Sequence, residues 1–195
     1  MAGSDLVAPV LLLAMPQVVD PFFRKSVVLL VAHEPDGSLG FVVNRDTELK
    51  VVEILRDLEL PWGGDPDLPA GFGGPVQPQV GTVLFAPEAE EGLPDLPAAN
   101  EVAPGIRLTQ HLTELAAIAG RPPARCRLLL GYAGWGEGQL VEEILRNDWL
   151  TAPVDRELVF GRGTEVVWEA ALRSVGVAPE SLPTWTTPEP EEGAN

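Results

Sequence analysis

The chain has 195 residues, of which 29 are Asp or Glu and 13 are Lys or Arg, so its formal net charge is −16. This length suits one domain with a sizeable hydrophobic core, and an apolar fraction of 45% excludes a disordered acidic chain. The single cysteine, Cys126, excludes a disulfide framework and a cysteine-rich zinc site.

The charge balance bears on possible partners. Nucleic-acid binding depends on Lys and Arg contacts to phosphate, and this chain offers few of them. Between Arg56 and Arg107 there is no basic residue, although nine acidic residues lie there. The simpler interpretation of this stretch is a solvated face, and an acidic docking surface is the alternative. We therefore predict that direct nucleic-acid binding is not the function.

The longest apolar stretch near the start, residues 6–15, has ten residues and contains Pro9. It falls short of the roughly 20 residues that a membrane-spanning helix needs. It also lacks the basic leader of a secretory signal. The sequence therefore predicts a soluble, cytoplasmic protein without a membrane anchor.

The first half of the chain reads mainly as strands. Residues 10–14 are apolar, and residues 26–32 are apolar after Ser26, as in a strand covered on both faces; residues 26–44 predict a hairpin. Thr47 is a candidate N-cap for a helix that ends before Pro61. Residues 61–104 are loop-rich, and one strand is predicted among them, at 81–85. The acidic excursion at 86–104 is expected to be exposed.

The second half alternates helices and strands. Three helices are predicted. The first begins at the cap Thr109, ends at Ala119 and buries Leu112. The second follows Gly138, and the third begins at the cap Thr164 and is ended by Gly176. Strands are predicted at 127–132 and 158–160. Together these elements indicate a single α+β or α/β domain over residues 1–182, followed by a disordered acidic tail at 183–195.

Metal and nucleophile chemistry have little support. The two histidines, His33 and His111, lie far apart and outside any metal-ligand spacing, so no metal or cofactor is predicted. Cys126 lies between Arg125 and Arg127, which could lower the thiol pKa. A cysteine entering an apolar strand is more often a buried, small apolar residue, and we favour that interpretation.

The segment from Gly131 to Gly138 is rich in glycine and lies between a predicted strand and a predicted helix. It matches no phosphate-binding motif, and Glu137 at the helix start would oppose an anion. A tight turn packed by Trp135 is the favoured interpretation. The alternative is a site for a neutral or cationic ligand, with Tyr132, Trp135 and Gln139 offering stacking and hydrogen bonds.

Polar residues next to predicted strand ends are the other candidates. Asp20 precedes Pro21 and could cap a turn, and Arg45 follows Asn44 at the end of the hairpin. The Arg45 guanidinium suits a carboxylate, so we expect an ion pair with Asp20 or Glu34.

Several segments in order along residues 10–180 resemble the YqgE/AlgH family. The resemblance lies in Ala14-Met-Pro16, Asp20-Pro-Phe-Phe-Arg24, Gly40-Phe-Val-Val-Asn-Arg45, Gly73-Gly-Pro-Val76, Leu130-Gly-Tyr-Ala-Gly-Trp-Gly-Glu-Gly-Gln-Leu140 and Asn147-Asp-Trp-Leu150. The chain departs from the family at Asp46, where proline is usual, and it lacks the usual Arg-Gly and histidine after Val76 and the C-terminal Gly-His-Ala.

The resemblance implies a mixed, bifurcated sheet curled into a pseudo-barrel with flanking helices. It implies little chemistry: some members are described as candidate transcriptional regulators of exopolysaccharide synthesis, and no catalytic residues are established. We therefore predict a non-enzymatic binding or regulatory protein that acts through a protein or a small ligand. Its candidate site residues are Asp20, His33, Asn44, Arg45, Gly131, Tyr132, Trp135 and Gln139. The alternative is a hydrolase that uses Asp20, His33 and Arg45.

Overall fold

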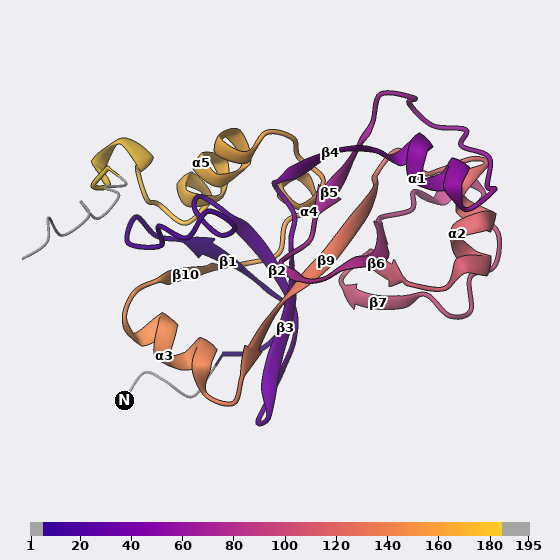
Figure 1. The fold of residues 1–195 in the computed structure, drawn as a ribbon. Coiled ribbons are helices and arrows are strands. Elements are labelled where there is room, and N and C mark those ends of the chain that lie inside the picture. Colours follow the sequence, from indigo (N-terminus) through magenta and orange to yellow (C-terminus); the bar gives the residue numbers. More distant parts are fainter. Residues whose placement is uncertain (1–5, 185–195) are drawn as a thin grey trace, which may run out of the picture.

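The computed structural model describes residues 6–184, which form a mixed sheet flanked by helices (Figure 1). The strands are β1 (Val10–Ala14), β2 (Val27–Glu34), β3 (Gly37–Val42), β4 (Asp46–Lys50), β5 (Pro69–Phe72), β6 (Val76–Phe85), β7 (Asn100–Ala103), β8 (Ile106–Thr109), β9 (Cys126–Gly136) and β10 (Trp149–Ala152). The α-helices are α1 (Val51–Asp57), α2 (Leu112–Ala119), α3 (Gln139–Leu145), α4 (Arg156–Val159) and α5 (Thr164–Ser174), with 3-10 turns at Ala89–Glu91 and Pro179–Ser181.

Strand β9 is where the sheet divides. The main strand order is β10-β1-β2-β3-β9-β6-β8-β7, and β4 joins through β5, which pairs with β9 in parallel. The first part of β9 therefore lies between β5 and β6, whereas its last four residues pair with β3. The prediction of a mixed, bifurcated sheet curled into a pseudo-barrel with flanking helices is confirmed, and the curled part of the sheet is a half-barrel.

The apolar runs of the N-terminal half form the centre of this sheet. Residues 11–14 and 27–30 are fully buried, because side chains pack on both faces of β1 and β2. On one face lies α5, whose Trp168 donates its indole N–H to the Ala14 carbonyl at 2.9 Å. The predicted strand at 10–14 and the hairpin are confirmed. The hairpin turn is short, since β2 ends at Glu34 and β3 begins at Gly37.

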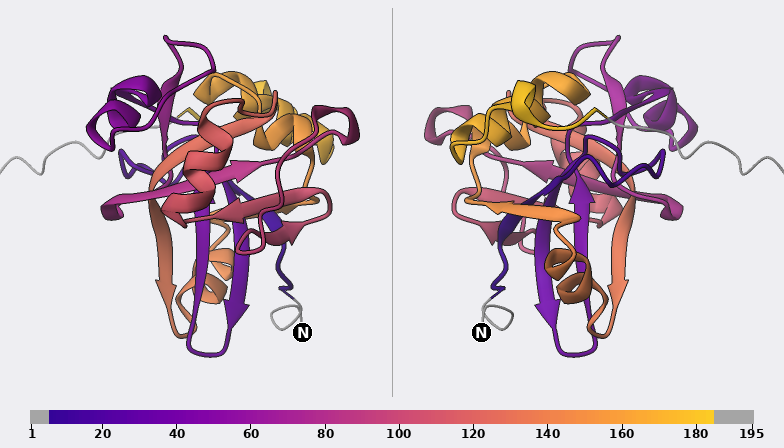
Figure 2. Two further views of the ribbon diagram at one scale, coloured as in Figure 1. Left: turned by 90° about the vertical axis from the view of Figure 1, so that its right-hand side faces the viewer. Right: turned by 90° about the vertical axis from the view of Figure 1, so that its left-hand side faces the viewer.

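The helices surround the sheet at three places. α5 lies over one face of β1 and β2 with α4 beside it, α3 lies beside β10 and the lower part of β9, and α1 and α2 lie on the opposite side of the molecule (Figures 1 and 2). The long strands β2, β3 and β9 run side by side away from α5 toward the hairpin turn.

The glycine-rich segment is strand, not loop, which corrects the sequence interpretation. β9 continues through Tyr132 and Trp135 to Gly136, and Ser38 and Gly37 of β3 pair with its last two residues. Gly131 is needed because it has φ +72° and because a Cβ there would lie 2.3 Å from the Gly74 carbonyl oxygen.

The conformation of Gly131 also changes which side chains share a face. Strict alternation would place Leu130 and Tyr132 on the same face of β9. Instead Leu129 and Tyr132 pack in one cluster, whereas Ala133 and Trp135 pack in the cluster on the other side. The irregular pairing of β6 with β9 at this point accompanies the change.

Three predicted elements are wrong in type or boundary. Thr47 lies in β4, and α1 begins only at Val51. Residues 158–160 are not a strand, because α4 spans Arg156–Val159 with Asp155 capping it. Thr109 ends β8, so α2 starts at Leu112, and the Leu112 side chain is exposed rather than buried. Each error concerns a short segment, of four or five residues, or the start of a helix.

The acidic excursion at 86–104 is more ordered than expected for an exposed loop. Leu96 is only 1% exposed, and the Arg107 guanidinium donates to the Leu96 and Ala99 carbonyls at 2.7 and 2.9 Å. The Glu114 carboxylate on α2 accepts the Ala98 N–H at 2.6 Å. The composition of the segment itself could not predict this order, because the side chains that hold it come from β8 and α2.

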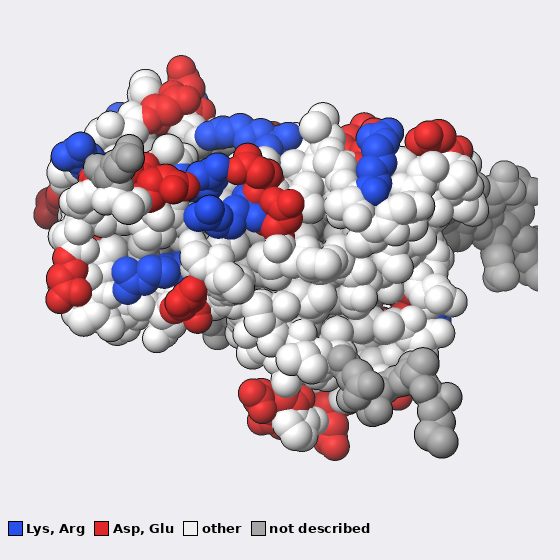
Figure 3. Space-filling model, turned by 180° about the vertical axis from the view of Figure 1, so that it is seen from behind, with Lys and Arg blue, Asp and Glu red and all other residues white. Residues whose placement is uncertain are grey.

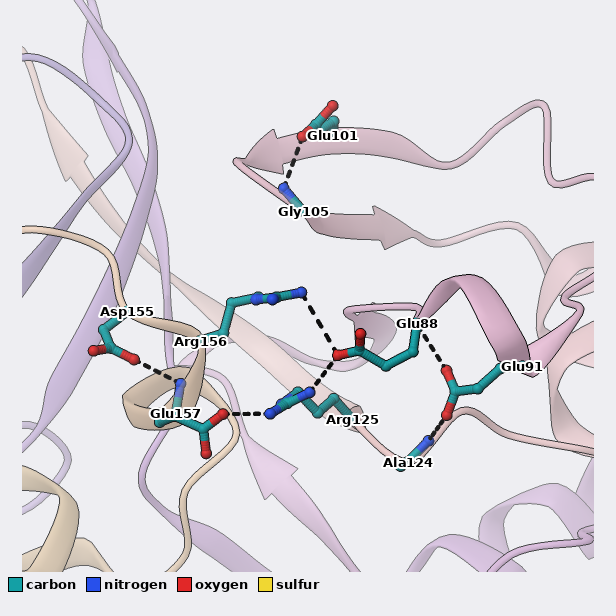
Figure 4. Close-up of polar contacts among 9 residues, drawn as sticks. All are labelled: Glu88, Glu91, Glu101, Gly105, Ala124, Arg125, Asp155, Arg156 and Glu157. Carbon is teal, nitrogen blue, oxygen red and sulfur yellow. Dashed lines mark hydrogen bonds and ion pairs between the residues drawn. The ribbon is translucent and has the colours of Figure 1, made fainter.

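A network of charged side chains connects the same segment to the residues just before β9 and to α4 (Figure 4). Glu88 contacts Arg125 at 2.5 Å and Arg156 at 3.8 Å, and Arg125 also pairs with Glu157. The Glu91 carboxylate accepts the Ala124 N–H at 2.8 Å. Most of these side chains are partly exposed, so the network orients the segment more than it stabilises the fold.

The described residues contain no helix that combines the length and the apolar character needed to cross a membrane. The predicted tail at 183–195 lies outside the described residues from position 185 onward.

Candidate functional site

A cleft of about 420 Å³ lies where the segment between β1 and β2 meets the end of β9, helix α3 and the start of β10. Its wall is lined by Gln17, Val18, Val19, Asp20, Phe23, Gly134, Trp135, Gln139, Glu143, Arg146, Asp148 and Trp149. We call it the Trp135–Trp149 cleft. It brings together segments that are more than 100 residues apart in sequence, because β1 pairs with both β2 and β10.

Three aromatic rings form one wall of this cleft. The Trp135 and Trp149 ring centroids lie 6.0 Å apart at 82°, and Phe23 meets Trp149 edge-on at 5.9 Å and Trp135 at 6.4 Å. Edge-to-face packing of this kind is favourable because the positive ring edge meets the negative ring face. Trp135 is 6% exposed and Trp149 5% exposed, so the rings are held in place.

One carboxylate fixes both indoles. Glu143 Oε2 accepts the Trp135 indole N–H at 2.9 Å and the Trp149 indole N–H at 2.8 Å. Its other oxygen accepts the Gln139 side-chain amide at 2.9 Å, and Gln139 in turn accepts the Gly136 N–H. Gln139 and Glu143 lie one turn apart on α3, which places both side chains over the cleft.

The rim of the cleft is acidic. Glu143, Asp20 and Asp148 contribute three carboxylates against one guanidinium, that of Arg146. Arg146 is already committed to Asp148, since its Nη2 lies 2.9 Å from the Asp148 carboxylate, and this hydrogen bond raises the pKa of Arg146. The formal charge of the lining is therefore −2.

The structure gathers only part of the predicted site. Asp20, Trp135 and Gln139 line the cleft together. Trp135 is buried, as the packing interpretation of this segment expects. Tyr132 packs in the cluster on the opposite side of the sheet, and the Gly131 backbone lies against the Gly74 carbonyl. Neither residue therefore belongs to the cleft.

Asn44 and Arg45 hold the backbone instead of lining the cleft. The Asn44 side chain is 2% exposed; it accepts the Val27 N–H and donates to the Lys25 and Thr164 carbonyls, all within 2.9 Å. Arg45 donates to the Arg24 carbonyl at 2.6 Å. The expected ion pair of Arg45 with Asp20 or Glu34 is not formed among the described residues, although the Asp20 charge partly offsets the lowering of the Arg45 pKa by burial.

The arrangement needed for the hydrolase alternative is not formed. His33 lies at the turn end of the β2–β3 hairpin, where its Nδ1 is 2.7 Å from the Ser38 hydroxyl. Arg45 follows the other end of β3, and the extended strand from Ser38 to Val42 alone spans about 13 Å. A general base must lie within about 3 Å of its partner, or one water away. His33 is therefore too far from Arg45 to act with it.

Neither a reactive thiol nor a metal site emerges. Burial raises the pKa of the Cys126 thiol to about 12, which agrees with a small core residue rather than a nucleophile. Over residues 6–184, His, Cys, Asp and Glu side chains do not gather in threes as metal ligands would.

Sequence reasoning missed Phe23, Glu143 and Trp149. The available signal was the spacing of Gln139 and Glu143, which places two polar side chains on the same face of a helix that follows Trp135. The role of Trp149 could not be assigned from the sequence around it, because the two rings that it packs against, Trp135 and Phe23, lie on β9 and before β2.

Comparison with known proteins gives the family. The AlgH-like family model matches residues 11–180, so the chain belongs to this family. A UPF0301 protein from Jannaschia sp. is 43% identical and is covered over 90% of its length by 88% of this chain. A UPF0301 protein from Methylococcus capsulatus is 41% identical, with 92% of it and 89% of this chain covered.

Solved structures agree with this assignment. The solution structure of the AlgH protein from Pseudomonas aeruginosa is 35% identical with a TM-score of 0.70, covering 86% of this chain and 88% of that one. A crystal structure from Corynebacterium diphtheriae has a TM-score of 0.72 and covers 89% of both chains; at 22% identity it supports the fold alone. The names of these relatives specify no activity.

Proposed function

We propose that this protein is a cytoplasmic, non-enzymatic binding module that holds a cationic group, from a small ligand or a protein side chain, in the Trp135–Trp149 cleft. The observation that carries the proposal is an aromatic wall fixed by Glu143 beside two further carboxylates. Cations are attracted to indole faces within about 6 Å, and a cleft with an excess of carboxylates raises their local concentration.

The same charges argue against an anionic ligand. A phosphate would meet Asp20, Asp148 and Glu143, and the single guanidinium in the cleft is paired with Asp148. Over the whole chain the net charge of −16 disfavours nucleic acid, and on the face shown in Figure 3 the basic side chains lie beside acidic ones. A regulatory role would then operate through the bound ligand or a partner protein and not through direct contact with DNA.

The test uses small cations and reads the site directly. Tetramethylammonium and L-arginine amide are titrated into the protein while NMR follows the indole N–H signals of Trp135 and Trp149. Both cations should shift these signals, whereas neopentyl alcohol, a neutral compound of similar shape to tetramethylammonium, should not. The variant that tests the charge of the site is Asp20→Asn. Asp20 is exposed, and asparagine retains a side-chain oxygen that can accept the Phe22 N–H.

The matched control is Asp36→Asn, which removes one exposed carboxylate at the hairpin turn, away from the cleft. We expect Asp20→Asn to weaken cation binding about threefold or more, because a carboxylate near the surface contributes up to about 1 kcal/mol to a contact ion pair. Asp36→Asn should leave it unchanged. Equal binding of the neutral compound, or no shift of either indole signal, would contradict the proposal.

A further inference from the structure

A second hollow, of about 360 Å³, lies on the opposite side of the molecule between α1 and α2, with β6 and β9 as its floor. It is lined by Ile54, Asp57, Leu58, Gln79, Gly81, Gln110, Leu112, Leu115, Leu128 and Leu130. We call it the α1–α2 groove. Figure 1 shows the two helices next to each other at the end of the molecule remote from α3 and α5.

Two leucines on the rim of this groove are exposed in the single chain. Leu58 is 44% exposed and Leu112 is 55% exposed, on the α1 side and the α2 side respectively. Leu58 continues the helical spacing of Val51, Ile54 and Leu55, a pattern typical of a buried helix face. Single exposed leucines need no explanation, but two that flank an apolar floor form a continuous apolar surface.

The charge around the groove has one predominant sign. Among the residues that line it, Asp57 is charged and none is basic. α1 carries Glu53, Arg56 and Asp57, whereas the one carboxylate of α2, that of Glu114, is buried and accepts the Ala98 N–H instead of lining the groove. Beyond α1 the chain continues without a basic residue until Arg107. An occupant of this groove should therefore be apolar at its centre and basic at its edges.

The floor also restricts the shape of the occupant. β6 and β9 are hydrogen-bonded neighbours, so the groove presents the face of a sheet and not a free edge to which a strand could add. Apolar side chains between two helices suit a third helix, whose anchors recur at positions i, i+3 or i+4, and i+7.

We propose that the α1–α2 groove docks an amphipathic helix of a partner protein, with an apolar face flanked by Lys or Arg. A second copy of this chain fits less well, because each copy has a net charge of −16 and a two-fold contact would bring Asp57 toward its equivalent. This surface is distinct from the Trp135–Trp149 cleft and shares no lining residue with it.

The experiment uses two synthetic helical peptides of 18 residues, each with leucines spaced at 3 and 4 residues. One has Lys and Arg beside the leucines and the other has Glu at the same positions. Binding to the full chain is measured by fluorescence anisotropy, and NMR follows the methyl signals of Leu128 and Leu130 in the floor. The basic peptide should bind and shift both signals, and the acidic peptide should not bind.

The decisive variant is the double substitution Leu58→Glu with Leu112→Glu, both at exposed positions. It removes apolar contacts but adds two negative charges, so non-specific attraction of the basic peptide would increase. We expect binding to fall at least tenfold. The control Val166→Glu adds a charge at a 69% exposed valine on α5 and should change binding less than twofold.

Circular dichroism verifies that the double variant is folded. The proposal is overturned if the basic peptide does not bind, if both peptides bind equally, or if the double variant binds the basic peptide as tightly as the unchanged protein. It is also overturned, in favour of a second copy, if light scattering shows a dimer that the double variant abolishes.

Discussion

Replacing Trp135 by alanine should destabilise the protein strongly. The side chain is 6% exposed, packs against Phe23 and Trp149, and donates a hydrogen bond to Glu143. Truncating a buried tryptophan to alanine costs about 3–5 kcal/mol, a large share of the 5–15 kcal/mol by which a domain is typically stable. For a chain of this size each kcal/mol lowers the melting temperature by about 2–4 °C, so we expect a fall of roughly 10 °C.

Trp135→Phe separates the packing of the ring from its hydrogen bond. Phenylalanine retains most of the apolar contact but lacks the N–H that Glu143 accepts, while Trp149 and Gln139 still donate to that carboxylate. Hydrogen bonds to charged groups contribute about 1.5–3 kcal/mol, so this variant should lose about 1.5 kcal/mol plus a smaller packing loss. Its stability should lie clearly between those of Trp135→Ala and the unchanged protein.

Urea unfolding followed by circular dichroism measures both variants, with Val166→Ala at a 69% exposed position as the control, expected within about 0.5 kcal/mol of the unchanged protein. A free energy of unfolding for Trp135→Ala within about 1 kcal/mol of that of the unchanged protein would refute this prediction. Such a result would mean that the aromatic wall is not held by packing and that Trp135 serves the ligand alone.

Three further predictions concern single positions elsewhere. Gly131→Ala should lower the free energy of unfolding in urea by about 3 kcal/mol or more, because φ is +72° and a Cβ would overlap the Gly74 carbonyl oxygen. Gly138→Ala, with φ +71° but open space around it, should lower it less. Asn44→Ala should cost about 3 kcal/mol by thermal unfolding, since it leaves three backbone groups without their partner. Burial raises the pKa of the Glu114 carboxyl, but hydrogen bonds from Thr109, Ala98 and Ala99 outweigh burial and hold that pKa below its ordinary value of 4.5. The ionised carboxylate therefore stabilises the fold above that value, the contribution is lost as the pH falls through the lowered pKa, and Glu114→Gln should flatten the acid limb of the stability curve.

The sequence by itself determined the segments in which every residue is buried or in which the apolar residues recur at a regular spacing. Residues 11–14 and 27–30 are apolar on both faces, so they could only be central strands, and they are buried completely. The last helix was equally clear, because its apolar residues recur at helical spacing and Gly176 follows it, although the N-cap is Gly163 and the predicted cap, Thr164, is already the first helical residue. The family resemblance added the bifurcated sheet, which the alternation of elements alone did not specify.

Only the tertiary structure decided what the glycine-rich segment is. Its composition favours a turn, but pairing with β3 and β6 makes it a strand, and the need for Gly131 arises from Gly74, a residue 57 positions away. The cleft has the same origin: Asp20, Trp135 and Glu143 come from separate elements, and the pairing of β1 with β2 and β10 brings them together. Local sequence encodes burial and helical or extended periodicity, whereas which backbones approach each other depends on contacts between residues far apart in the chain.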